Sequence, residues 1–334
     1  MKKIVSVILA LTLCLAITAC GNTTSSTTTS SGTTSSETAG TDAAGSDATG
    51  DDVVAYTVGI CQLMEHESLD KATQGFIDAL TEEIEKEGKT VTIDTQVAGE
   101  ANLCTTVINT FTAKEVDLIM ANATPALLAA ANATTTIPVL GTSVTDYADT
   151  FGGNIPANVS GTSDAVPFDE QAQMMINTLG LTAGDKVGVL YCTNESNSLI
   201  QYNAVKELFE AEGIVVEAYT FSETTELQAL VNSAAGSCKA IYVPSDNTVA
   251  QNDSIVGTIC TENNVPVFTS YGGEICYASL AIDYYELGRE TGKMAAEVLL
   301  GKTNVEDIEI KTLVPTVVYN DELCAQLGIT IPEN

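Results

Sequence analysis

The chain has 334 residues, a length that suits two domains of ordinary size. Hydrophobic residues make up 45% of the chain and charged residues 17%, so most of it can fold around packed cores. Its 44 acidic and 13 basic residues give a formal net charge of −31, and so acidic a surface repels phosphate backbones. This charge argues against a nucleic acid as a partner.

The composition also argues against most enzyme chemistries. The sequence contains one histidine, His66, and no tryptophan. A single imidazole nearly excludes His-based catalytic triads and zinc sites built on several imidazoles. No nucleophile motif of the form GxSxG occurs, and the segment 300–303 lacks the first glycine of a phosphate-binding loop. We therefore expect that the protein is not an enzyme and has no catalytic residue, cofactor or metal ion.

The first residues form a pattern typical of secretion signals. Two lysines, Lys2 and Lys3, precede an apolar run over residues 4–17, which is too short to span a bilayer comfortably. The run ends in Ile17-Thr18-Ala19-Cys20, which resembles the bacterial lipobox, a signal whose cysteine becomes the diacylated first residue of the mature chain. The sequence therefore predicts a lipoprotein signal peptide over residues 1–19 and a membrane anchor on Cys20.

A polar segment follows the predicted anchor. Residues 21–52 are almost only Thr, Ser, Gly, Ala and Asp, and they include no large apolar side chain that could build a core. We expect residues 20–54 to form a lipidated, disordered tether that holds an extracytoplasmic body at the membrane. So long a polar tether favours a Gram-positive cell surface over a Gram-negative periplasm.

From residue 55 onward, short apolar runs alternate with amphipathic stretches. Residues 69–87, for example, carry apolar side chains at three-to-four spacing and end before Gly88, as a helix does. Such alternation predicts a parallel sheet covered by helices. The first half gives strands at 56–61, 91–97, 116–120 and 137–140, and helices at 69–87, 102–114 and 124–133.

The same pattern restarts in the second half. It gives helices at 168–179, 196–212, 224–235, 248–263 and 284–300, strands at 186–191, 214–219, 240–243 and 265–269, and an extended segment at 308–318. We therefore expect an α/β fold with two doubly wound parallel-sheet lobes and a cleft between them. The seven cysteines of the body include no CxxC pair, and we expect them to be small core residues rather than a disulfide framework.

Ligands of open parallel sheets bind beyond the carboxyl ends of the strands. At these positions the sequence carries small polar side chains, and helix N-termini with hydroxyl groups favour a carboxylate. Asp246 and Asp283 could balance an ammonium group, so the set suits a zwitterion such as an amino acid. Each residue could instead simply cap a helix. The candidates are Gln62, Glu65, Thr124, Ser143, Asn194, Ser196, Asn197, Ser198, Asp246, Asn247, Tyr271 and Asp283.

Five segments in order carry a family resemblance. They are 58–66 (VGICQLMEH) with 69–76, 159–167 (VSGTSDAVP), 189–198, 240–249 (AIYVPSDNTV) and 283–289 (DYYELGR). Together they resemble the bacterial ABC-transporter substrate-binding family that includes the tryptophan and other aromatic amino-acid binding lipoproteins. The resemblance spans about residues 56–329.

The family implies a type I periplasmic-binding-protein fold, in which two lobes are joined by three crossovers. Here these would fall near residues 158–160, 281–283 and 310–315. The N-terminal lobe would comprise residues 55–157 and 282–306, and the C-terminal lobe residues 158–281 and 307–334.

The resemblance also implies a function. A monomeric protein would capture an aromatic amino acid such as tryptophan or phenylalanine between its lobes and deliver it to a membrane permease powered by a separate ATPase. Two alternatives stay open from the sequence. One is a lipoprotein that binds a nucleoside or another small molecule, and the other is a ligand sensor for a membrane receptor.

Overall fold

The computed structural model describes residues 55–332, which belong to one compact unit of the chain. The predicted signal peptide, Cys20 and the tether lie outside the described residues. Within residues 55–332, no helix combines the length and the apolar character needed to cross a membrane.

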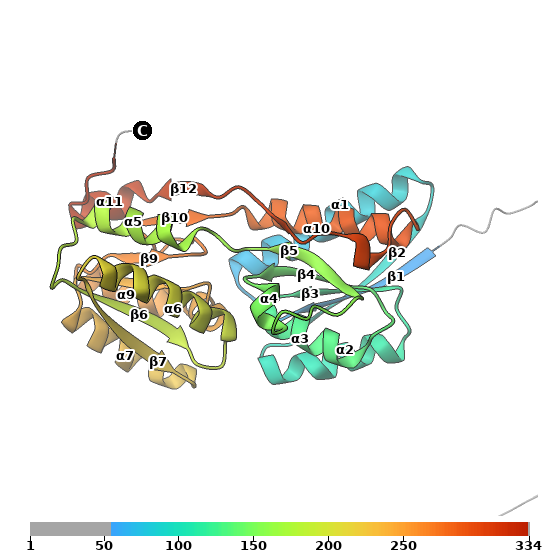
Figure 1. The fold of residues 1–334 in the computed structure, drawn as a ribbon, viewed down its shortest axis with the longest axis horizontal. Helices are drawn as coiled ribbons and strands as arrows, with labels where there is room; N and C mark the ends of the chain where they lie inside the picture. The colour runs from blue at the N-terminus through green and yellow to red at the C-terminus, as the bar shows by residue number, and fades with distance from the viewer. Residues whose placement is uncertain (1–54, 333–334) are drawn as a thin grey trace, which may run out of the picture. The chain divides into compact units, whose positions relative to one another are not determined.

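The described chain forms two six-stranded sheets, whose strands are labelled in Figure 1. The first sheet has the order β11-β5-β4-β3-β1-β2, and all its neighbouring strands are parallel. Every residue of β3 and β4 is buried, as expected of strands that helices cover on both faces. The strands are β1 (Ala55–Gln62), β2 (Thr90–Val97), β3 (Leu118–Asn122), β4 (Val139–Val144), β5 (Val159–Ser163) and β11 (Lys311–Thr312).

The second sheet has the order β12-β10-β9-β8-β6-β7. Only its edge strand β12 runs antiparallel to its neighbour, β10. The strands are β6 (Lys186–Cys192), β7 (Val215–Phe221), β8 (Ala240–Val243), β9 (Val267–Thr269), β10 (Ala278–Ala281) and β12 (Thr316–Tyr319).

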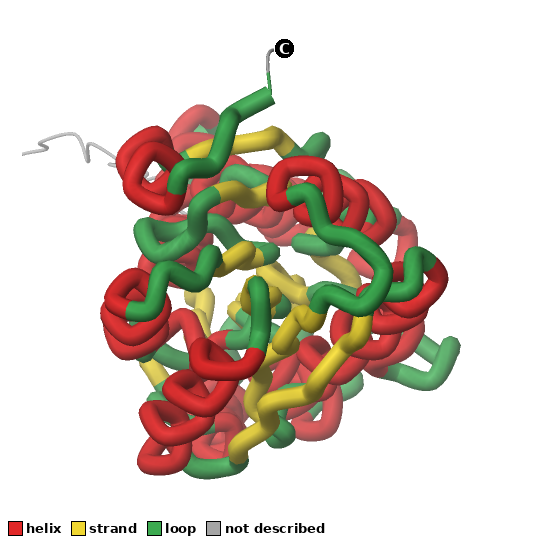
Figure 2. Tube along the Cα trace, turned by 90° about the vertical axis from the view of Figure 1, so that its left-hand side faces the viewer, coloured by secondary structure: helices red, strands yellow, loops and turns green. Residues whose placement is uncertain are grey.

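Helices cover the strands of both sheets, as the red and yellow segments of Figure 2 show. With the first sheet, α1 (Glu67–Lys86), α2 (Cys104–Ala113), α3 (Thr124–Ala133), α4 (Tyr147–Thr150) and α10 (Tyr284–Leu299) form the first lobe. With the second sheet, α5 (Phe168–Leu179), α6 (Ser196–Ala211), α7 (Thr224–Ser237), α8 (Asn247–Gln251), α9 (Asp253–Glu262) and α11 (Asp321–Leu327) form the second lobe. The predicted α/β fold with two lobes is confirmed.

The structure differs from the predicted elements in one helix and one strand, and from the expected lobe boundaries at two places. The predicted helix over 248–263 is split into α8 and α9 at Asn252. The strand β5 has the sequence VSGTS, which is fully buried although it is polar, so its hydrophobic pattern did not reveal it. Because β5 pairs with β4, the first crossover follows Ser163 rather than lying at 158–160. Likewise β11 pairs with β5, so residues 311–312 belong to the first lobe and not to the second.

The seven cysteines of the body are all buried, as expected of small core residues. Cys61 and Cys104 contribute to the core of the first lobe, whereas Cys324 contributes to that of the second. The chain also passes between the two sheets at 282–283 and at 313–315.

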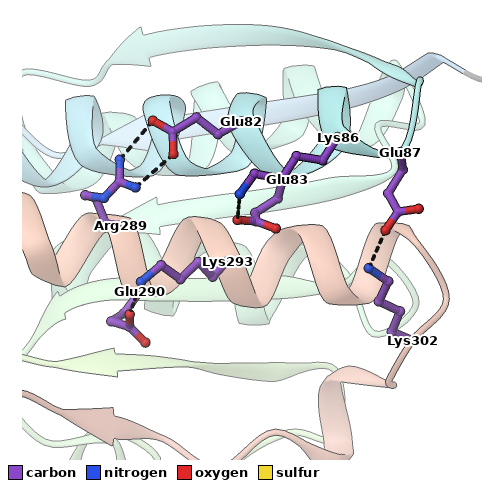
Figure 3. A network of polar contacts seen from close by, with 8 residues as sticks. All are labelled: Glu82, Glu83, Lys86, Glu87, Arg289, Glu290, Lys293 and Lys302. Carbon is purple, nitrogen blue, oxygen red and sulfur yellow. Dashed lines mark hydrogen bonds and ion pairs between the residues drawn. The ribbon is translucent and has the colours of Figure 1, made fainter.

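The helices α1 and α10 make the most extensive contact between two elements of the fold. Their backbones touch at glycines: a Cβ on Gly288 would overlap the carbonyl oxygen of Ala72, and a Cβ on Gly75 would overlap that of Tyr285. Figure 3 shows ion pairs along the same contact, in which the Arg289 guanidinium lies 2.9 Å from the Glu82 carboxylate. Close backbone contact, rather than these solvent-exposed charges, therefore holds the two helices together.

We expect Gly288→Ala to lower the free energy of unfolding by about 2 kcal/mol or more, because the added methyl group has no space against α1. Gly236 is the matched control, since it also lies inside a helix but has no neighbouring atom within 4 Å of the place that a Cβ would take. Gly236→Ala should be neutral or stabilising by up to about 1 kcal/mol. Urea unfolding of both variants measures the difference, and equal stabilities would contradict the role given to this contact.

Candidate ligand-binding site

The carboxyl ends of strands from both sheets meet at a cavity between the lobes, which we call the interlobe cavity. The cavity is small, with a volume of about 10 Å³, which is room for about one water molecule. Ser143 of β4 and residues that follow β1 and β5 line it from the first lobe, and residues that follow β8 and β9 line it from the second. The first lobe contributes His66, Ser68, Ser143 and Asp164, and the second contributes Asp246, Asn247 and Tyr271.

A wider hollow adjoins this cavity and shares Ser68, Tyr271 and Tyr284 with it. A second hollow, which is lined by Glu100 of the first lobe and Asn194 of the second, opens between the lobes elsewhere. Ligand atoms that extend beyond the interlobe cavity therefore have space along the boundary between the lobes.

Asp164 places a carboxylate in the interlobe cavity. It directly follows β5, and only 5% of its surface is exposed. Its oxygens accept hydrogen bonds from two neutral hydroxyls, those of Thr145 at 3.1 Å and Tyr284 at 2.9 Å. Burial raises the pKa of the Asp164 carboxyl, although these hydrogen bonds oppose the shift. Among the described residues, no basic side chain forms a salt bridge with Asp164.

Hydrogen-bond donors line the same cavity. The hydroxyls of Ser143 and Tyr271 are buried and have no hydrogen-bond partner within the described chain. The helix α1 begins at the cavity, and no side chain caps its N-terminus at His66. Uncapped N–H groups and the helix dipole favour an anion at such a position. The cavity therefore offers donors for a carboxylate together with an acceptor for an ammonium group.

The backbone at this edge of the first sheet is strained. Ser143 has a φ of 55° and Ala123 a φ of 89°, in a region that residues with a side chain rarely adopt. The two residues lie at the ends of β4 and β3, which are neighbours in the sheet. Strain of this kind is concentrated at ligand sites, where it directs side chains and N–H groups. Here it accompanies an unpartnered Ser143 hydroxyl.

Asp246 and Asp283 have structural roles, and both cap helices, which was the alternative left open for them. Asp246 is fully buried, and its carboxylate accepts hydrogen bonds from the N–H groups of Cys192 and Val249 and from the Ser198 hydroxyl, at 2.7–2.9 Å. Asp283 is exposed and caps α10 through the N–H groups of Tyr285 and Glu286. Asp246 lines the interlobe cavity, whereas Asp283 lines only the wider hollow.

Of the candidates that follow β6 and β8, Asn247 lines the interlobe cavity, whereas Asn194, Ser196 and Asn197 do not. Asn247 is held by Glu195, whose carboxylate accepts hydrogen bonds from its N–H at 2.9 Å and from its side-chain Nδ2 at 2.6 Å. The Asn197 amide donates to the Ser245 carbonyl at 2.7 Å, and its Oδ1 has no partner. Asn194 and Ser196 are exposed and lie away from the interlobe cavity.

Three candidates of the first lobe do not line the interlobe cavity. Gln62 is buried, and its side chain donates to the Met64 carbonyl and to Asp70 while accepting a hydrogen bond from Thr73. Glu65 is exposed, and Thr124 is buried at the start of α3. The helix-cap alternative describes Asp246 and Asp283, whose side chains accept N–H groups at the starts of α8 and α10.

The predicted site residues do not include Asp164 and His66, which line the interlobe cavity. Asp164 follows β5. Because this strand was not predicted, the rule that ligands bind beyond the carboxyl ends of strands did not point to Asp164. It does lie within the segment 159–167 on which the family resemblance depends, and this was the one signal that could have found it.

A two-lobed α/β fold with a polar cavity at facing strand ends defines a solute-binding protein. The family model described as "ABC transporter substrate binding protein" matches residues 57–334. The chain therefore belongs to this family. It is similar to a tyrosine-binding protein of Clostridioides difficile (strain R20291), with 36% identity over 284 residues that cover 81% of each chain.

Solved structures agree with this assignment. A protein from Streptococcus pneumoniae in complex with L-Trp has 30% sequence identity and a TM-score of 0.77 over 84% of this chain and 97% of that one. The ligand-free, open structure of a substrate binding protein with adhesive properties from Clostridium difficile has 34% identity and a TM-score of 0.63 over 84% and 97%. The present structure thus superposes better on the L-Trp complex, although that protein is less similar in sequence.

We expect Asp246→Ala to destabilise the ligand-free protein by about 2 kcal/mol or more, because it leaves two buried N–H groups and a buried hydroxyl unpaired. Asp283→Ala removes only an exposed cap and should cost about 1 kcal/mol. Asp246→Asn keeps one acceptor and should recover part of the loss. Urea unfolding without ligand measures all three, and an unchanged midpoint for Asp246→Ala would contradict its structural role.

Proposed function

We propose that this protein is the extracytoplasmic solute-binding lipoprotein of an ABC importer and that its ligand is an aromatic amino acid. Tyrosine and tryptophan are the first choices, because a tyrosine-binding protein and an L-Trp complex are among the proteins that it resembles. The protein itself carries out no reaction: the two lobes close over the ligand and present it to a membrane permease.

The observation that carries this proposal is the buried Asp164 carboxylate, which lacks a cationic partner among the described residues. A buried charge is costly unless a partner compensates it. The other buried carboxylates, Glu195 and Asp246, accept backbone N–H groups, whereas the side chain of Asp164 accepts only two hydroxyls. The ammonium group of an amino acid would supply the missing cation at Asp164, and this replaces the assignment to Asp246 and Asp283.

The carboxylate of the ligand would lie against hydrogen-bond donors. The free N–H groups at the start of α1 and the unpartnered hydroxyls of Ser143 and Tyr271 are donors that line the same cavity. Buried donors without partners are costly in the free protein and become satisfied when a carboxylate binds. A zwitterion therefore matches both the charge and the hydrogen-bonding capacity of the interlobe cavity.

We expect Asp164→Asn to weaken the binding of L-tryptophan by a factor of about 100 or more, because it removes the charge that pairs with the ammonium group. The chain has no tryptophan, so excitation beyond the absorption of tyrosine reports the emission of the ligand alone. Protein refolded from denaturant, to remove any carried ligand, is titrated with L-tryptophan, and L-tyrosine is tested by competition.

Glu65→Gln is the matched control, because Glu65 is an exposed carboxylate near the cavity that lies outside its lining. This variant should bind as the unmodified protein does. Indole-3-propionate, which lacks the ammonium group, should bind weakly to the unmodified protein and lose little in Asp164→Asn. Equal affinity of L-tryptophan for Asp164→Asn and the unmodified protein would refute the assignment of Asp164.

The anchor is a separate part of the proposal and rests on the sequence of residues 17–20. If Cys20 is lipidated, expression of Cys20→Ala in a bacterial host should move the protein from the membrane fraction to the soluble or secreted fraction. Immunoblots of fractionated cells measure this change, with Cys14→Ala inside the predicted signal peptide as the control. Retention of Cys20→Ala in the membrane fraction would exclude this anchor.

A further inference from the structure

The lone histidine of the chain forms a hydrogen bond between the lobes. His66 lies in the first lobe directly before α1, and its Nε2 is 3.1 Å from the Oδ1 of Asn247, the first residue of α8 in the second lobe. Among the described residues, one other side-chain hydrogen bond joins the lobes, from Gln201 to Thr145 at 3.3 Å. That second bond contains no group that titrates near neutral pH.

Neighbouring residues fix the direction of the bond between His66 and Asn247. The Nδ2 of Asn247 donates to the Glu195 carboxylate at 2.6 Å, so the Oδ1 of the same amide must face His66. The Nε2 of His66 is therefore the donor. Glu195 itself is held by the N–H and hydroxyl of Thr248, at 2.8 and 2.7 Å, so the acceptor is presented by a rigid part of the second lobe.

We propose that His66 and Asn247 form a latch between the lobes, and that protonation of His66 weakens ligand retention, because it places a positive charge on a ring that closure buries, although the Nε2–H donor is kept. The latch rests on the proposed ligand-binding function and adds a control of that same site by pH. It can exist only when the lobes are together, because its two halves belong to different lobes. The lobe arrangement that carries it is the one that superposes better on the L-Trp complex.

The surroundings of His66 explain the direction of the effect. Burial lowers the pKa of the imidazole, while the bond to Asn247 and the carboxylates of Glu195, Asp70 and Glu67 oppose this shift only in part. Glu67 is itself paired with Lys71 at 2.6 Å. The N-terminus of α1 carries a partial positive charge, so it disfavours a further positive charge on the imidazole of His66. Asp246 lines the same cavity but is occupied by its own hydrogen bonds.

His66 is partly buried, and opening the lobes would expose it further and return its pKa towards the ordinary value of about 6.5. The closed state then binds fewer protons than the open state. Closure is therefore strongest above pH 6.5 and weakens as the pH falls from there towards the lower pKa of the closed state. For one proton, the dissociation constant should rise by at most about tenfold per pH unit in that window.

The lone histidine makes the test direct. In a chain without affinity-tag histidines, proton NMR shows one imidazole Cε1–H resonance, which can be titrated with and without saturating L-tryptophan or L-tyrosine. We expect the ligand to lower the pKa of His66. In parallel, the dissociation constant of the ligand is measured between pH 5 and pH 7.5 for the unmodified protein, His66→Gln and Glu65→Gln.

His66→Gln keeps a donor but cannot titrate, so its profile should be flatter than that of the unmodified protein in this range, whatever its affinity at pH 7.5. His66→Gln also retains Asp164, so any pH dependence due to the Asp164 carboxyl is present in both profiles and cancels when they are compared. Glu65→Gln, next to His66 but exposed, should keep the full slope. If the ligand binds but His66→Gln has an unchanged slope and the His66 pKa does not move, the latch is refuted while the proposed function stands. If neither amino acid binds at any pH, both fail.

Discussion

The contact between α1 and α10 is the constraint on which the site depends. The chain enters α10 from the second lobe at residues 282–283, and the glycine contact with α1 holds it in the first lobe. The start of α10 carries Tyr284, which donates to Asp164, and the start of α1 carries His66 and Ser68, which line the interlobe cavity. One helix pair thus positions Tyr284 against Asp164, the proposed ammonium acceptor, and also the free N–H groups of α1 and half of the proposed latch. Any shift of α10 along α1 would move these groups relative to one another.

Electrostatics explain why these groups are found together in so acidic a chain. Glu195, Asp246 and Asp164 are buried near the boundary between the lobes, although burial penalises a carboxylate. Glu195 and Asp246 are stabilised by N–H and hydroxyl groups of their own lobe, and they order the α8 terminus. Asp164 has weaker support, so its charge is the one that a cationic ligand group can satisfy. The distinction is one of hydrogen-bond partners, because all three residues are similarly buried.

The sequence predicted the architecture well and the site only in outline. Apolar periodicity gave α5 and α10 almost to the residue, since it reflects the packing that forms helices. The same rule failed for β5, whose Ser160 and Thr162 are buried but satisfied by specific partners such as Ile308 and Thr291. Residue type also placed Asp246 at a helix start without showing whether it caps the helix or binds a ligand. That depends on which N–H groups lie within reach, which only the tertiary structure determines.

The proposed closure and recognition are linked because they use adjacent residues of the same helix termini. His66 precedes the α1 N–H groups that would bind the carboxylate, and Asn247 follows Asp246 in the wall of the cavity. A ligand that holds the start of α1 in place therefore also holds the imidazole against its acceptor. Closing the lobes in turn buries Asp164 and strengthens its attraction for an ammonium group, since charges interact more strongly away from water. Each event thus favours the other, and a proton on His66 would act against both.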